Sequence, residues 1–189
     1  MKLAKAVIGG LLLAATPLAA MADDMSYSYV DLGYAQLDID GVGPSADGFG
    51  LRGSIGFAQN WFAFAGYTAE SVQGIDIDTI SVGVGGHYGF TDNLDLVGRL
   101  GYFEINLDAG GGLNADDNGY LLDAGLRGRV GDAVELEGGL HYTDLSDGGD
   151  DTALYVGGRF HFNKTWALGA EYASGDNSSE IFAYVRASF

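Results

Sequence analysis

The chain ends in Ile181-Phe182-Ala183-Tyr184-Val185-Arg186-Ala187-Ser188-Phe189, a stretch in which two kinds of residue alternate. Every second residue, from Ile181 to Phe189, is apolar, whereas the residues between them include Arg186 and Ser188. Successive side chains of a strand point to opposite faces, so this period of two predicts a strand with one wholly apolar face. Such a face meets either a shared protein core or lipid.

Similar alternating runs recur along the chain and are separated by breaks of two kinds. Short breaks fall at 59–60, 91–93, 131–132 and 163–164. Longer acidic breaks fall at 38–47, 74–78, 108–119, 146–151 and 175–180. The two kinds follow each other in turn, and together they predict ten strands, with eight as the alternative. The expected strands are 26–37, 48–58, 61–72, 78–90, 94–107, 119–130, 133–145, 152–162, 165–174 and 180–189.

Charged residues share one face of these runs. If the apolar faces point outwards, a polar network of six arginines, three histidines and six acids fills the interior. Its members are Arg52, Arg99, Arg127, Arg129, Arg159, Arg186, Asp31, Asp95, Asp123, Glu135, Glu137, Glu171, His87, His141 and His161. A soluble sandwich would reverse this arrangement, whereas a central arginine on the lipid face of a barrel costs about 2–4 kcal/mol. Residues 61–65 are apolar on both faces, so the direction of Glu70 stays open.

Aromatic residues on the outward faces gather at two heights. Beside the short turns are Phe57, Trp61, Phe90, Phe162, Trp166 and Phe189. Towards the acidic breaks are Tyr34, Phe49, Tyr67, Tyr102, Tyr120, Tyr142 and Tyr172. Rings at two heights are typical of the interfacial girdles of a membrane barrel. The sequence therefore predicts an all-β fold, a transmembrane antiparallel up-and-down β-barrel.

The first residues predict export from the cytoplasm. Lys2 and Lys5 precede an apolar stretch at 6–15 that is too short to span a bilayer, and Ala20-Met21-Ala22 is a small-x-small cleavage site. We expect a cleaved signal peptide at 1–22 and one barrel domain at 23–189. The remaining seven basic and 26 acidic residues carry a formal charge of −19, which argues against nucleic acid as a partner. Cysteine is absent, so no disulfide is available.

Three segments and the C-terminus resemble a family of small outer-membrane barrels first described in xanthomonads, near the OmpA/OmpX-like barrels. The segments are 26–30, 46–54 and 93–99, and the likeness extends over 162–166 to Phe189. The resemblance implies a Gram-negative outer membrane with both termini in the periplasm. It also implies contact with outer-membrane lipid and lipopolysaccharide, and Phe189 as an assembly signal for the barrel assembly machinery. Its motifs are structural and supply no catalytic residues.

No nucleophile and base stand out in the sequence, so we expect no enzyme, no catalytic residue and no cofactor. Asp144 with His141, or His87 with Ser81, are the pairs that general acid–base chemistry could use. The acidic breaks offer oxygen ligands for divalent ions, but none matches a full calcium loop, and we expect no metal site. The predicted role is that of a monomeric structural or surface-interaction barrel of the adhesion or biofilm type, acting through acidic external loops. The alternative is a narrow porin-like channel, in which inward Gly83, Gly85, Gly125 and Gly157 leave a water path.

Overall fold

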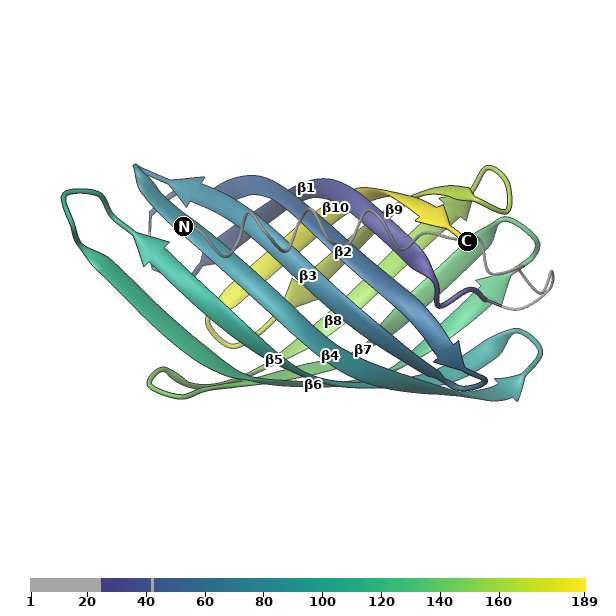
Figure 1. Cartoon of the computed structure of the whole chain (residues 1–189). Helices are drawn as coiled ribbons and strands as arrows, with labels where there is room; N and C mark the ends of the chain where they lie inside the picture. Colours follow the sequence, from purple (N-terminus) through teal and green to yellow (C-terminus); the bar gives the residue numbers. More distant parts are fainter. Residues whose placement is uncertain (1–24, 42) are drawn as a thin grey trace.

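A computed structural model describes residues 25–41 and 43–189, which form one closed antiparallel barrel of ten strands (Figure 1). Each strand pairs with its neighbours in the chain, and β1 closes the barrel against β10. The strands are β1 (Tyr29–Ile39), β2 (Ala46–Ala58), β3 (Trp61–Val72), β4 (Ile75–Thr91), β5 (Leu94–Asp108), β6 (Asn114–Val130), β7 (Val134–Leu145), β8 (Gly149–His161), β9 (Trp166–Ser174) and β10 (Ser178–Ser188). The prediction of an all-β up-and-down barrel with ten strands, not eight, is confirmed.

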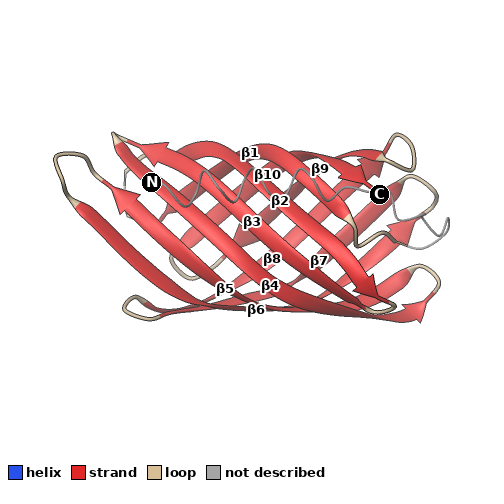
Figure 2. Cartoon of the chain, in the orientation of Figure 1, coloured by secondary structure: helices blue, strands red, loops and turns tan. Residues whose placement is uncertain are grey.

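The described residues are strands, turns and loops without a helix (Figure 2). Accordingly, none of them belongs to a helix that is long and apolar enough to cross a membrane. The expected signal peptide at 1–22 lies outside the described residues, so its cleavage stays a prediction.

The barrel has two ends, which we call the terminal end and the loop end. At the terminal end lie Tyr29, Ser188 and the four turns that follow β2, β4, β6 and β8. At the loop end lie the other five connections, and the hairpin of β5 and β6 projects furthest there in Figure 1.

The connections at the loop end are shorter than the sequence predicted, because the strands continue through acidic residues. The break expected at 74–78 is a two-residue turn of Gln73 and Gly74, both with positive φ, and β4 begins at Ile75. The break expected at 108–119 shrinks to residues 109–113. Aspartate is disfavoured in strands, but pairing with a neighbouring strand satisfies the backbone of these extensions.

Apolar side chains cover the outside of the barrel, as the alternation predicted. Leu32, Val82, Leu122 and Leu154 are all more than half exposed there. The outward aromatic residues lie in two belts, with Trp61 and Trp166 near the terminal end and Phe49 and Tyr120 near the loop end. An exposed apolar band between aromatic belts fits the hydrocarbon core and interfaces of a bilayer.

The interior is packed partly by aromatic rings that lie over glycines of neighbouring strands. A Cβ at Gly85 would collide with the ring of Phe62, and one at Gly83 with that of Phe64. Phe62 is only 1% exposed, which settles the direction of β3: its even-numbered residues, Glu70 included, point inwards.

Candidate functional site in the barrel lumen

The register of the strands places opposite charges directly across from one another inside the barrel. Asp31 on β1 lies between Arg186 on β10 and Arg52 on β2. Glu135 on β7 lies between Arg129 on β6 and Arg159 on β8. Directly opposed side chains of a sheet are its closest side-chain neighbours, so charges alternate across β10, β1 and β2 and across β6, β7 and β8.

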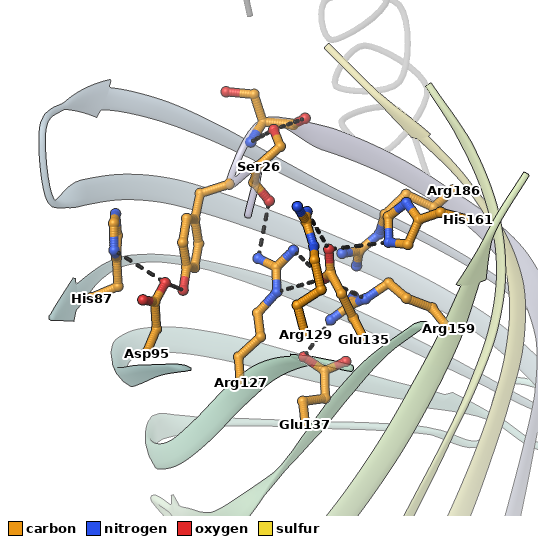
Figure 3. Close-up of polar contacts among 12 residues, drawn as sticks. Ser26, His87, Asp95, Arg127, Arg129, Glu135, Glu137, Arg159, His161 and Arg186 are labelled. Atoms are coloured by element: carbon orange, nitrogen blue, oxygen red, sulfur yellow. Dashed lines mark hydrogen bonds and ion pairs between the residues drawn. The ribbon is translucent and has the colours of Figure 1, made fainter. Parts of the chain in front are cut away.

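Glu135 is the centre of a buried ion cluster towards the terminal end (Figure 3). Its Oε2 accepts hydrogen bonds from Arg127 Nε and Nη2 at 3.0 and 2.7 Å, and its Oε1 accepts one from Arg129 at 3.1 Å. Arg159 Nε lies 3.2 Å from Oε2, and His161 Nε2 lies 3.1 Å from Oε1. The side chains of Glu135 and Arg159 are each 1% exposed. We call these five residues the Glu135 cluster.

Residues that precede β1 close the terminal end further. The Tyr27 ring stacks on His87 at 4.0 Å and on Phe62 at 5.0 Å between centroids, and its hydroxyl donates to Asp95 at 2.7 Å. Burial raises the pKa of this hydroxyl, so it stays protonated and donates at neutral pH. Arg127 donates to the Ser26 carbonyl at 2.9 Å, which attaches this segment to the Glu135 cluster. Tyr27 and the Glu135 cluster therefore lie side by side in the lumen near the terminal end.

A second buried pair joins the first and last strands. Arg186 Nε and Nη2 donate to the two oxygens of Asp31 at 2.6 and 2.7 Å, a bidentate geometry. The Arg186 guanidinium also lies 3.5 Å from the centre of the Tyr29 ring. Both side chains of the pair are at most 5% exposed.

The ion pairs towards the loop end are more open. Arg52 donates to Glu171 at 2.8 Å and to Glu180 at 3.1 Å, with its guanidinium 4.0 Å from the centre of the Phe182 ring. These three charged side chains are 20–38% exposed. Asp123 contacts His141 and accepts from Arg99 at 3.4 Å, a long hydrogen bond.

These ion pairs line a cavity of about 400 Å³ inside the lumen. Tyr29, Asp31 and Arg186 line its floor, whereas Glu70, Ile105 and Glu180 line it nearer the loop end. None of the five residues of the Glu135 cluster lines this cavity. Glu137, which accepts from Arg159 of the cluster at 2.9 Å, does line it. We call this cavity the loop-end cup.

All fifteen residues of the predicted polar network lie on the lumen side of their strands and take part in the contacts above or in the His87–Asp95 pair at 3.5 Å. Sequence reasoning missed four other groups. Glu180 was placed at the boundary between a loop and the last strand, Glu70 had no assigned face, Tyr27 was interpreted as part of a strand, and Phe182 was not connected with Arg52. The period of two carried a signal for three of them: Glu180 and Phe182 share the face of Arg186, and Tyr27 shares that of Asp31.

Two further expectations from the sequence can be compared with the structure: the water path beside inward glycines and the acid–base pairs. The rings of Phe64, Phe62 and Tyr155 occupy the space over Gly83, Gly85 and Gly125, where the channel alternative expected water, whereas the nearest atoms to a Cβ at Gly157 would lie 3.3 Å away.

One of the acid–base pairs considered from the sequence, His141 with Asp144, does not form in the described part of the chain. His141 contacts Asp123 inside the lumen. Asp144 lies three residues after His141 on β7 and therefore points to the opposite, outer face of the strand. Across residues 25–41 and 43–189 there is no group of three or more His, Cys, Asp or Glu side chains that could hold a metal ion.

Comparison with known proteins agrees with this architecture. The family described as "Outer membrane protein beta-barrel domain" matches residues 8–183. A search of curated proteins finds no match.

Solved structures similar to this chain include three barrels. The KdgM porin is 13% identical, with 84% of this chain and 99% of that chain covered and a TM-score of 0.48. Neisserial surface protein A (NspA) is 19% identical, with 87% and 98% covered and a TM-score of 0.45. Ail, the attachment invasion locus protein of Yersinia pestis, is 17% identical, with 87% and 98% covered and a TM-score of 0.39. The family match spans most of the sequence, and the chain belongs to the outer-membrane β-barrel family.

Proposed function

We propose that this protein is a non-enzymatic outer-membrane barrel that does not conduct and that acts at the cell surface through its loop end. The observation that carries this proposal is the Glu135 cluster. Its five side chains, from the adjacent strands β6, β7 and β8, meet inside the lumen with Glu135 only 1% exposed. Ten strands enclose a narrow lumen that side chains largely fill. We therefore infer that this cluster and Tyr27 block the lumen and that the barrel serves as a membrane anchor.

In the proposed orientation the terminal end faces the periplasm and the loop end faces the exterior. Exposed carboxylates such as Asp40, Asp76, Asp116 and Asp150 then form an anionic rim. Other rim acids accept hydrogen bonds from the backbone: Asp117 from Asn118 at 2.7 Å and Asp151 from Asp176 at 3.0 Å. The free acids of the rim are the proposed contacts for surface partners, including lipopolysaccharide phosphates bridged by divalent ions. The C-terminal strand with Phe189 is the proposed contact for the assembly machinery.

The first test is conductance of the refolded protein across a planar lipid bilayer, after heat-modifiable gel mobility has shown that it is folded. We expect no discrete current steps. Reproducible steps from the folded barrel would overturn the anchor role and favour the narrow channel.

The second test concerns the rim. Asp116→Asn with Asp150→Asn removes two exposed charges at the loop end, and Asp92→Asn with Asp132→Asn removes two at the terminal end as a matched control. We expect the first pair alone to change adhesion or biofilm formation by cells that display the protein at equal levels. Equal behaviour of the two double variants would contradict a role for the rim.

A further inference from the structure

Glu70 is a buried acid with one oxygen that no described residue contacts by a hydrogen bond. Its side chain points into the lumen near the loop end of β3 and is 8% exposed, and its Oε1 has no partner among the described residues. The residues directly opposite, Gly48 on β2 and Ile77 on β4, bring no side-chain donor. An unsatisfied buried acceptor costs stability. Protonation would remove this cost, and so would a ligand that donates.

The charges around Glu70 favour a cationic ligand. Glu70 lines the loop-end cup, and the charged groups that act on it are Glu180, Arg52 and Asp47. Arg52, the only cation among these three, is already shared by Glu171 and Glu180. The lining as a whole contains seven carboxyl groups against three arginines, with His141 in addition. The excess of carboxyl groups makes the cup attractive to positive charge.

Part of the lining of the cup is apolar. Phe103 and Ile105 on β5 and Leu121 on β6 line it, beside Arg99 and Asp123 on the same two strands. Round the closed barrel β5 lies opposite β10, which carries Glu180, whereas only β4 separates β5 from β3, which carries Glu70. A ligand bonded to Glu70 therefore has apolar side chains two strands away.

The size and chemistry of the cup select an organic cation over a metal ion. Its volume of about 400 Å³ lies within the range of roughly 300–1,000 Å³ for small-molecule sites. The carboxyl groups of the described residues are not clustered as metal ligands are.

We propose that the loop-end cup binds an organic ammonium ion with an apolar body. Its N–H groups bond to Glu70, with Glu180 beside it, and its apolar part lies against Phe103 and Leu121. This inference goes beyond the anchor role and does not depend on it, because binding and conductance are measured separately.

The test is a titration of the folded protein in lipid nanodiscs with 2-phenylethylammonium chloride, followed by calorimetry and by NMR of labelled Ile and Phe side chains. We expect saturable binding, with the signals of Ile105 and Phe103 shifting. The neutral analogue 2-phenylethanol should bind at least tenfold more weakly, since it lacks the charge while partitioning into lipid in a similar way.

Three variants identify the group that binds. Glu70→Gln keeps the size of the side chain and should weaken binding of the ammonium probe at least tenfold. Glu180→Gln, at a side chain that is 38% exposed, should weaken binding severalfold and serves if the first variant does not fold. Glu104→Gln is the matched control, because Glu104 is an exposed acid near the loop end whose recorded partner is Asn106; it should leave binding unchanged.

Several results would overturn the proposal. They are the absence of saturable binding to the folded protein, equal binding by the Glu70→Gln variant, or shifts confined to lipid-facing residues. Greater stability of the Glu70→Gln variant without any probe binding would identify Glu70 as a neutral buried acid and would also overturn it.

Discussion

The two halves of the lumen contain the same types of charged residue but differ in how completely those residues are paired. Towards the terminal end, the Glu135 carboxylate is contacted by three arginines and a histidine and is 1% exposed. Towards the loop end, Arg52 is shared by the carboxylates of Glu171 and Glu180, whose side chains are 20% and 38% exposed. One oxygen of Glu70 has no hydrogen-bond partner among the described residues. Composition alone therefore does not decide whether a barrel interior is closed. The more fully paired half owes its contacts to the strand register and to Tyr27, which adds a ring and a hydroxyl from outside the sheet.

The two halves should differ most in how much the free energy of unfolding falls when one carboxylate is removed. Glu135→Gln removes the carboxylate that pairs with the buried Arg127 and that Arg159 shares with Glu137, and it should lower the free energy of unfolding by about 3–5 kcal/mol. Glu171→Gln removes a partner of the more exposed Arg52 and should cost about 1 kcal/mol or less. Guanidinium chloride unfolding of both variants in lipid vesicles measures this. Equal losses would show that the two halves are energetically alike.

A smaller difference is expected from adding one methyl group at a glycine in each half. At Gly85 the new Cβ would collide with the rigid Phe62 ring and lie 2.9 Å from the Gly98 carbonyl oxygen, so Gly85→Ala should cost about 1–3 kcal/mol. At Gly66, which lines the cup, the nearest atom is the Ser81 hydroxyl oxygen at 2.7 Å. A hydroxyl can rotate away, and Gly66→Ala should cost less than about 1 kcal/mol. The unfolding midpoints of the two variants decide the order; a reversed order would mean that the cup is the more tightly packed region.

The smallest effect concerns salt. A double-mutant cycle on Arg52 and Glu180, with Arg52→Met and Glu180→Gln, should give a coupling free energy below about 1 kcal/mol that falls as NaCl rises from about 0.1 M to about 1 M. The same cycle on Asp31 and Arg186, whose side chains are at most 5% exposed, should change little with salt. A salt-sensitive Asp31–Arg186 pair would show that ions reach the floor of the cup.

Sequence periodicity predicted which face each charged residue occupies, because a strand has a period of two and one face meets lipid. It did not predict partners, because these depend on register: Glu135 faces Arg129 and Arg159 only when β6, β7 and β8 pair as they do. Strand ends were less predictable at the loop end, where β4 continues through Asp76 and Asp78, residues that usually mark a loop. The direction of Glu70 was hidden by residues 61–65, which are apolar on both faces. Tyr27 was hidden because it precedes β1 and enters the lumen from outside the repeating pattern.

The bidentate pair of Asp31 and Arg186 also bears on the order of events in assembly. Its partners are 155 residues apart and belong to the first and last strands, which meet over eleven residue pairs. In a barrel that grows strand by strand, these two charges remain hydrated until the seam shuts, and only then lose water and bond to each other. A substitution that breaks this pair should therefore lengthen the lifetime of open folding intermediates more than it changes the structure of the closed barrel. A spectroscopic reporter at the seam would time the final step of folding.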